Sequence, residues 1–217
     1  MIRRLAAGLA LASFLLPLTG SAQQERPRRL FPPEELGELE GPDRDAWQKP
    51  DLVMDVLRIG EGSVVADVGA GGGWFTVRLA RRVGPNGLVY AQDVQARMLE
   101  AIRRRVDREG VRNVRYVRGE TTDPNLPERA LDAVVIVDTY HEFANPVPLL
   151  RGLRASLKPT GRLGIVDFTM NGGGPGPPLT ERVRDELVID QAQRAGLRLL
   201  GRETFLEFQY LLIFGPG

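Results

Sequence analysis

The sequence predicts an α/β domain in which one doubly wound, seven-stranded and mostly parallel sheet lies between two layers of helices, as a three-layer sandwich. From residue 43 onward, short apolar runs alternate with segments whose apolar residues recur every three or four positions. Only two residues separate the last two apolar runs, which is too few for a parallel crossover, so an antiparallel hairpin should end the sheet. The composition agrees, because 42% apolar and 26% charged residues in 217 are typical of one soluble domain.

The individual elements follow from their local patterns. Seven apolar runs are expected as strands, at residues 63–68, 88–93, 113–118, 132–138, 162–168, 198–205 and 208–214. Amphipathic helices are expected from Trp74, over residues 94–106, from an Asn145 cap to residue 157, and from a Thr180 cap to Ala195 with Gly196 as C-terminal cap. Strands that alternate with helices imply right-handed crossovers. In such sheets, ligands bind at the carboxyl ends of the strands beside the first strand.

The N-terminal residues form a separate part of the chain. Residues 1–22 have the pattern of a secretory signal peptide, with a basic start, an apolar run of about 14 residues and small residues before the expected cut. A spanning helix needs roughly 20 apolar residues, so no stable membrane anchor is expected after signal removal. Residues 23–42 are rich in Pro and charge and are interpreted as a linker before a domain at 43–217. Export is expected, with a cytoplasmic or membrane-associated protein as the alternative.

Composition excludes several classes of function. The chain has no cysteine and one histidine, which excludes thiolate nucleophiles and thiolate metal sites and disfavours zinc, so no metal site is expected. The net charge of +1 gives no overall attraction to nucleic acid. The arginines between residues 97 and 118 alternate with acidic residues, which favours a solvated helix face over a nucleic-acid patch. The oligomeric state is not predicted.

A glycine-rich turn follows the first expected strand and reads Asp67-Val68-Gly69-Ala70-Gly71-Gly72-Gly73. Glycines allow a sharp turn and a close approach of the backbone to a ligand, and the next helix presents free N–H groups to a negative group. A nucleotide-type ligand is therefore expected. The dinucleotide fingerprint G-x-G-x-x-G would require glycine at position 74, where the sequence has Trp74, and a large indole leaves poor room for a pyrophosphate.

Two further acidic residues follow the next strands. Asp93, followed by Val94, ends the second strand, where its carboxylate can accept hydrogen bonds from both hydroxyls of a ribose. The alternative for Asp93 is a cap of the following helix. Glu120 comes after the third strand and could accept a hydrogen bond from an adenine amino group, or lie solvated in a loop.

Together these residues resemble the class I S-adenosylmethionine-dependent methyltransferases. The resemblance covers residues 43–217 and rests on the glycine turn, Asp93, Gly119-Glu120, the 157–163 segment and Ala195-Gly196-Leu197. The segments 44–50 and 138–143 resemble a bacterial subgroup whose substrates are mostly unassigned. The resemblance implies a Rossmann-like fold, S-adenosylmethionine as cofactor, and methyl transfer to an O, N or C atom of an unidentified small molecule. The implied cofactor-binding residues are Asp67, Gly69, Ala70, Gly71, Gly73, Asp93, Val94, Glu120 and Asp138.

The catalytic residues are less strongly indicated, because methyl transfer from a sulfonium donor depends mostly on alignment in a water-poor pocket. A hydroxyl or amine acceptor would also need a base, and His141 and Glu142 follow the fourth strand on the expected rim. His141 has a structural role as its alternative. Asp138 could contact the methionine moiety of the donor or cap the turn.

Two alternative functions remain open at this point. A nicotinamide-dependent oxidoreductase would use the same sheet and Asp93, although Trp74 argues against it. A non-catalytic domain that binds S-adenosylmethionine would keep the glycine turn without turnover. The segment 171–178, rich in Gly and Pro, is expected either as a mobile loop over the acceptor or as a slack connection.

Overall fold

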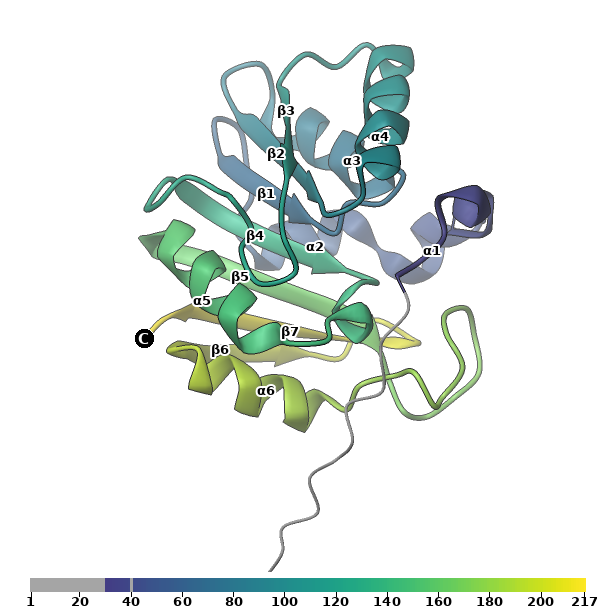
Figure 1. The fold of residues 1–217 in the computed structure, drawn as a ribbon, viewed down its shortest axis with the longest axis vertical. Coiled ribbons are helices and arrows are strands. Elements are labelled where there is room, and N and C mark those ends of the chain that lie inside the picture. The colour runs from purple at the N-terminus through teal and green to yellow at the C-terminus, as the bar shows by residue number, and fades with distance from the viewer. Residues whose placement is uncertain (1–29, 40) are drawn as a thin grey trace, which may run out of the picture.

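The computed structural model describes residues 30–39 and 41–217, and the expected signal peptide lies outside them. One seven-stranded sheet forms the centre of the molecule, in the order β3-β2-β1-β4-β5-β7-β6 (Figure 1). The strands are β1 Val64–Val68, β2 Leu88–Asp93, β3 Val114–Arg118, β4 Leu131–Val137, β5 Leu157–Phe168, β6 Leu197–Glu203 and β7 Gln209–Pro216. The seven expected strands are therefore confirmed, with shifted ends.

The direction of the last strand is also confirmed. The pairs from β3 across to β5 are parallel, whereas β7 pairs antiparallel with both β5 and β6. The hairpin places β7 inside the sheet, between β5 and β6. Its residues 209–215 are buried, as expected for a strand covered on both faces.

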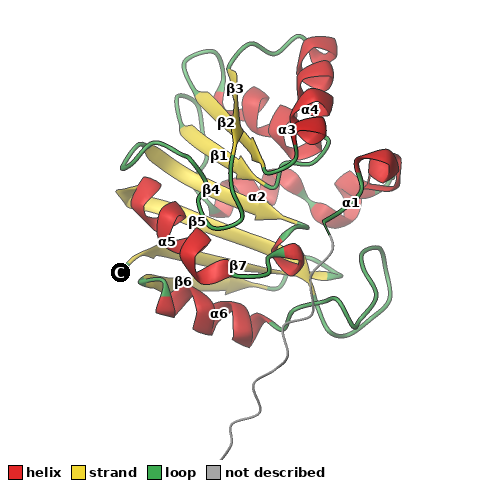
Figure 2. Ribbon diagram, viewed as in Figure 1, coloured by secondary structure: helices red, strands yellow, loops and turns green. Residues whose placement is uncertain are grey.

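Helices cover both faces of the sheet and give the three layers (Figure 2). The helices are η1 Pro33–Leu39, α1 Arg44–Gln48, α2 Pro50–Val56, α3 Trp74–Val83, α4 Ala96–Glu109, η2 Tyr140–Glu142, α5 Pro146–Ser156 and α6 Asp185–Arg194. Leucines of α5 and Val188 of α6 pack with β1, β4, β5 and β7 in one apolar cluster. Residues of α2 and α3 pack on the opposite face, and α4 packs beside α3. Burial of these two faces provides the main stabilisation of the domain.

The structure corrects two boundaries. Thr180 does not cap α6, which begins at Asp185 after a turn over residues 179–181. The Arg182 side chain donates to the backbone carbonyls of Thr169 and Pro177 and so holds this stretch outside a helix. The strand expected from residue 162 begins at Leu157, because α5 runs directly into it.

The N-terminal part of the domain holds elements that the sequence pattern did not predict. These are the short helices α1 and α2, and the 3₁₀ helix η1 within the segment interpreted as a linker. Among the described residues, no helix combines the length and apolar character needed to cross a membrane.

Candidate active site

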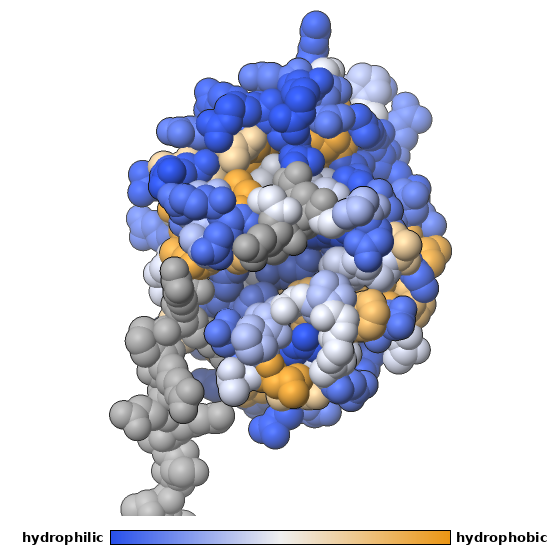
Figure 3. All heavy atoms as spheres, turned by 90° about the vertical axis from the view of Figure 1, so that its right-hand side faces the viewer, coloured by the Kyte–Doolittle hydropathy of each residue, from blue (hydrophilic) through white to orange (hydrophobic). Residues whose placement is uncertain are grey.

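A cavity of about 280 Å³ lies at the carboxyl ends of β1, β2 and β4, where the fold class predicts a ligand. Figure 3 looks onto this side of the molecule, and a hollow opens near the middle of the face. The cavity walls come from the glycine turn, the end of β2, the segment 137–144 after β4, and residues near the start of the described chain. The volume is near the lower end of the range of small-molecule sites, roughly 300 to 1,000 Å³.

The glycines of the turn have different tasks. Gly69, Gly71 and Gly73 have φ angles of 68°, 53° and 78°, in the left-handed region that favours glycine. A Cβ on Gly69 would lie 2.2 Å from the Thr139 side chain, so Gly69 is required for the packing of β1 against the segment after β4. A Cβ on Gly71 would meet no atom of the described residues within 4 Å, although Gly71 lines the cavity. Its open face is therefore available to a ligand.

Ala70 and Gly73 differ in their position relative to the cavity. Ala70 lines the cavity as the resemblance implied. Gly73 is not among the described residues that line it, and a Cβ there would lie 3.1 Å from Ile102 of α4. Gly73 thus allows close packing of the first turn of α3 against α4, and its part in cofactor binding is indirect.

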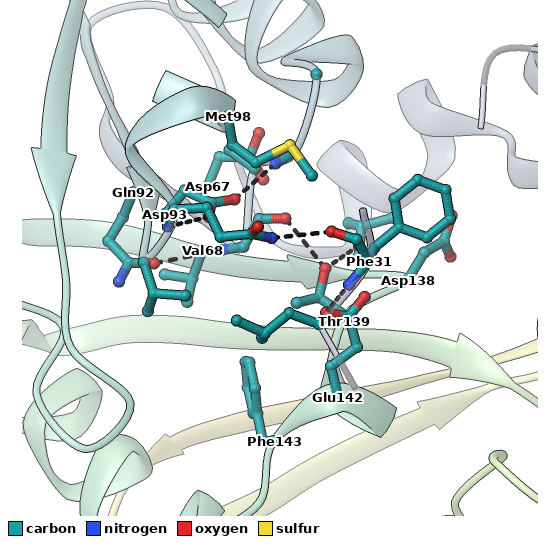
Figure 4. Close-up of a pocket in the computed structure, with 18 of the residues that line it drawn as sticks. Phe31, Asp67, Val68, Gln92, Asp93, Met98, Asp138, Thr139, Glu142 and Phe143 are labelled. Carbon is teal, nitrogen blue, oxygen red and sulfur yellow. Dashed lines mark hydrogen bonds between the residues drawn. The ribbon is translucent and has the colours of Figure 1, made fainter. Parts of the chain in front are cut away.

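Asp93 joins the glycine turn to the end of β2 (Figure 4). Its Oδ2 accepts a hydrogen bond from the Gly71 N–H at 3.0 Å, and its Oδ1 accepts one from the Gln95 N–H at 2.9 Å. The second contact precedes α4, so the capping role and the ligand role are compatible. Burial raises the pKa of Asp93. Each carboxylate oxygen can accept more than one hydrogen bond, so both can still accept from a ribose, and Val94 lines the cavity beside them.

Asp67 and Glu120 lie at opposite extremes of burial. The Asp67 carboxylate is buried and accepts a hydrogen bond of 2.6 Å from the Thr76 hydroxyl, and burial raises its pKa to about 6. Asp67 therefore ties the start of α3 to β1 while lining the cavity. Glu120 also lines the cavity, but it is exposed.

Asp138 is held by three side chains from distant parts of the chain. Arg44 donates to its Oδ2 at 2.7 Å, Gln48 donates to both oxygens, and Gln209 of β7 donates to Oδ1. Burial raises the pKa of Asp138, and the Arg44 guanidinium opposes that rise. Asp138 lines the cavity, yet its carboxylate is occupied by the protein itself.

Arg44 brings a positive charge to the cavity wall. Only 7% of Arg44 is exposed, and its guanidinium lies 4.3 Å from the centre of the Trp74 ring. It lines the cavity beside the glycine turn and is already paired with Asp138, so a ligand carboxylate would share the guanidinium with that partner. The sequence alone gave Arg44 no role, because its partner Asp138 is 94 residues away.

His141 and Glu142 are adjacent in the chain but face different surroundings. In the His141 ring, Nδ1 lies 2.9 Å from Oδ1 of Asp167, whose side chain is fully buried. The backbone N–H of His141 donates to Oδ2 of the same carboxylate. Burial acts to lower the pKa of His141, but Asp167 outweighs it and the pKa is raised. His141 is not among the described residues that line the cavity, whereas Glu142 lines it. Burial raises the pKa of Glu142 to about 7.

Several residues of the cavity were not predicted from the sequence. Phe31 lies beside Glu142, as Figure 4 shows, and lines the cavity together with Gln92, Met98, Thr139 and Phe143. An apolar pair at Leu30-Phe31 within a polar segment was the only available signal for the first of these. The others are two polar and two apolar residues without a motif in the sequence, and only the fold brings them to one place.

The segment 171–178 does not line the cavity among the described residues. Arg182 holds it through carbonyls, and Gly174 and Gly176 lie so close to Phe208 and Phe168 that a Cβ would approach those rings to 2.4 and 2.6 Å. The segment is thus packed on aromatic rings, which the two sequence interpretations did not anticipate. Trp47 packs against the same rings.

The described residues contain no group of three or more His, Asp or Glu side chains placed to hold a metal ion. What the cavity does offer is an acidic hydrogen-bond acceptor for hydroxyls at Asp93, an open backbone face at Gly71 and apolar walls. These features fit a nucleoside with a charged tail, since Arg44 lies beside the same turn.

Comparisons with known proteins agree with a nucleoside-type ligand, because they match methyltransferases. A methyltransferase-domain family matches residues 65–161. A crystal structure of an S-adenosylmethionine-dependent methyltransferase from Aquifex aeolicus matches with a TM-score of 0.81 and 29% identity, covering 85% of this chain and 98% of that one. The match to nearly the whole of that protein includes the antiparallel end of the sheet and supports the Rossmann-like methyltransferase fold.

Two curated relatives differ in their acceptors. A protein-L-isoaspartate O-methyltransferase of Methanothrix thermoacetophila is 29% identical over 66% of this chain and 70% of its own length. A ubiquinone/menaquinone biosynthesis C-methyltransferase of Ectopseudomonas mendocina is 30% identical over 64% of this chain, which spans only 52% of that relative. The matches give no support to an oxidoreductase. The fold, the family match and these relatives support a class I S-adenosylmethionine-dependent methyltransferase, with S-adenosylmethionine as the implied cofactor.

Proposed function

We propose that this chain transfers a methyl group from S-adenosylmethionine to an O, N or C atom of a small-molecule acceptor. The observation that carries the proposal is that Asp93, Gly71 with its open face, and Glu142 all line the same cavity. The named relatives act through O- and C-methylation, which supports the reaction class and leaves the acceptor atom open.

The cofactor-binding residues act by position. S-adenosylmethionine supplies an activated methyl group for transfer to a nucleophilic atom. Asp93 would accept hydrogen bonds from the ribose, Gly71 would allow the backbone to lie against the ligand, and Arg44, while paired with Asp138, would donate to the ligand carboxylate. Val94, Phe143 and Leu149 provide apolar surface that keeps water out, which strengthens the polar contacts inside the cavity.

For an acceptor with a hydroxyl or amine, we assign the proton-accepting role to Glu142. It lines the cavity, and a pKa of about 7 makes its carboxylate a competent base near neutral pH. His141 acts beside it as a positioning residue, because Asp167 fixes its ring and backbone through two hydrogen bonds.

Calorimetric titration of the full chain tests the cofactor first. S-adenosylhomocysteine should bind and NADH should not. Binding of NADH without binding of S-adenosylhomocysteine would restore the oxidoreductase alternative, and binding of neither would remove the cofactor proposal.

A methyl-transfer screen with labelled S-adenosylmethionine and small phenols, amines and carboxylic acids tests turnover. With a protic acceptor, Glu142→Gln should lower kcat by roughly 10² to 10⁴-fold, and His141→Gln should lower it less. The reverse ranking would assign the base to His141. Binding without transfer to any acceptor would favour the non-catalytic alternative.

We further propose export directed by residues 1–22, with a cytoplasmic or membrane-associated protein as the alternative. The basic start and the apolar run support this. Fractionation of cells that express the native gene is the test. Full-length protein in the cytosol would contradict export, and would also resolve how the enzyme reaches a donor that is made there.

A further inference from the structure

Residues 30–39, which we call the strap, lie across the cavity in the region interpreted from sequence as a linker. The strap contains the 3₁₀ helix η1 and is the first described part of the chain. Its Leu30, Phe31 and Leu36 line the cavity together with the glycine turn and the end of β2. Three apolar side chains of the strap therefore form part of the cavity wall.

Contacts hold the strap on both sides of the cavity. On the side of η2, the Phe31 N–H donates to Oε2 of Glu142 at 3.1 Å. On the side of α4, the Gln95 side chain donates to the Phe31 carbonyl at 3.0 Å. Both backbone groups of Phe31 thus bridge Gln95 and Glu142, which are 47 residues apart in the chain, and Phe31 lines the same cavity as the residues assigned to the cofactor.

A third contact lies farther along the strap. Glu34 of η1 forms an ion pair with Arg97 in the first turn of α4. Both side chains are more than half exposed, so this pair adds little stability. The strap is therefore fastened by a few hydrogen bonds and apolar contacts, which can open without unfolding the sheet.

The strap covers the cavity without filling it, because a volume of about 280 Å³ remains beneath it. Leu30 is 41% exposed and forms the outer edge of this cover. A ligand held by Asp93 and the glycine turn would therefore lie under the strap, with Phe31 between it and the solvent.

We propose that the strap is a gate for the cofactor, which must open at the Glu142 and Gln95 contacts before donor enters or product leaves. This inference rests on the proposed function, since it takes the cavity as the cofactor site. Strap opening then limits cofactor exchange, and the closed strap excludes water from the site during the reaction.

A cross-link across the Glu34–Arg97 pair tests the gate. The native chain has no cysteine, so the double variant Glu34→Cys/Arg97→Cys carries the only two thiols. A bis-maleimide that spans the pair locks the strap, and the same protein capped with a mono-maleimide leaves it free. Arg81→Cys/Glu109→Cys is the matched control, because that ion pair joins α3 to α4 and includes no residue of the strap.

The measured quantity is the rate at which bound S-adenosylhomocysteine is released, monitored by its displacement with labelled ligand. The locked strap should slow release roughly ten-fold or more relative to the capped protein, and the control cross-link should not change it. Equal release rates for the locked and capped proteins would overturn the gate. If the uncross-linked protein binds no S-adenosylhomocysteine, the proposed function fails instead, so the two failures are distinguishable.

A point variant tests the gate from the opposite direction. Phe31→Ala keeps both backbone hydrogen bonds but removes the ring, so release should become faster by roughly ten-fold at unchanged melting temperature. Leu200→Ala, which removes an exposed apolar side chain on β6, is the control and should leave release unchanged. Unchanged release in Phe31→Ala would contradict the gate.

Discussion

The ends of β1 and β2 and the ends of β4 and β5 each carry two buried carboxylates, and the two regions use them differently. Asp93 is bonded to backbone N–H groups of the turn, and Asp67 to Thr76, nine residues away. Asp138 is bonded by side chains that are 94, 90 and 71 residues distant. The first region is shaped by local contacts and presents acceptors to the cavity, whereas in the second Asp138 connects remote elements of the fold.

Because of this difference, removing a charged partner should have different consequences in the two regions. A carboxylate that faces a ligand can be removed with a loss of affinity, whereas a buried carboxylate that loses its cation leaves an uncompensated charge. The first region should therefore report mainly on ligand binding, whereas the second should report on stability and, because Arg44 also lines the cavity, on affinity.

The largest expected effect is on stability in the second region. Arg44→Met leaves the Asp138 carboxylate with amide donors only, and unfolding free energy should fall by roughly 3 to 5 kcal/mol. Arg81→Met, which removes the exposed ion pair with Glu109, should cost about 1 kcal/mol or less. Urea denaturation measures the unfolding free energy of both variants, and equal losses of stability would contradict the distinction between the regions.

The next effect is on affinity in the first region. Asp93→Ala removes the hydroxyl acceptor and should weaken S-adenosylhomocysteine binding by about ten- to a hundred-fold, or roughly 1.5 to 3 kcal/mol. Because burial already raises the pKa of Asp93, its ionised form disfavours folding, and the variant should keep most of its stability. Calorimetry and urea denaturation are the measurements. A variant that loses stability as Arg44→Met does would contradict the ligand-facing role.

Two glycines sharpen the comparison within one turn. Both Gly69→Ala and Gly71→Ala place a side chain at positive φ, at a cost of about 1 to 2 kcal/mol each. Gly69→Ala adds a collision with Thr139 and should lose the greater stability, whereas Gly71→Ala points into the cavity and should lose the greater affinity. The reverse order in denaturation and calorimetry would show that the ligand does not lie against Gly71.

The last expected effect is the pH dependence of stability at Glu142. Its folded pKa of about 7 lies above the ordinary 4.5, so its contribution to stability is fully present below about pH 4.5 and is lost as the pH rises through about 7. Glu142→Gln removes this component, so the difference in unfolding free energy between variant and native protein should grow in favour of the variant across this range. A constant difference would show that the Glu142 pKa is not raised.

The glycine turn, the place of Asp93, the succession of strands along the chain and the final hairpin could be predicted from sequence because each depends on neighbours in the chain. The partners of Asp138 could not, because Gln209 reaches it only after β7 has entered the sheet beside β5. Thr180 was misassigned as a cap because Ser and Thr patterns do not reveal that a nearby arginine binds the backbone carbonyls. Phe31 belongs to the same class, since its apolar ring has meaning only above a cavity built from other segments.

The position of β7 in the sheet also determines the order in which strands can join the sheet during synthesis on the ribosome. In the described chain β7 is the last strand to be synthesised, yet it separates β6 from β5, so β6 cannot join the growing sheet until β7 has emerged. The same strand delivers Gln209 to Asp138, which makes this corner of the site one of the last to be completed. A nascent chain should therefore acquire its glycine turn early and its finished catalytic rim only after the C-terminal residues have emerged.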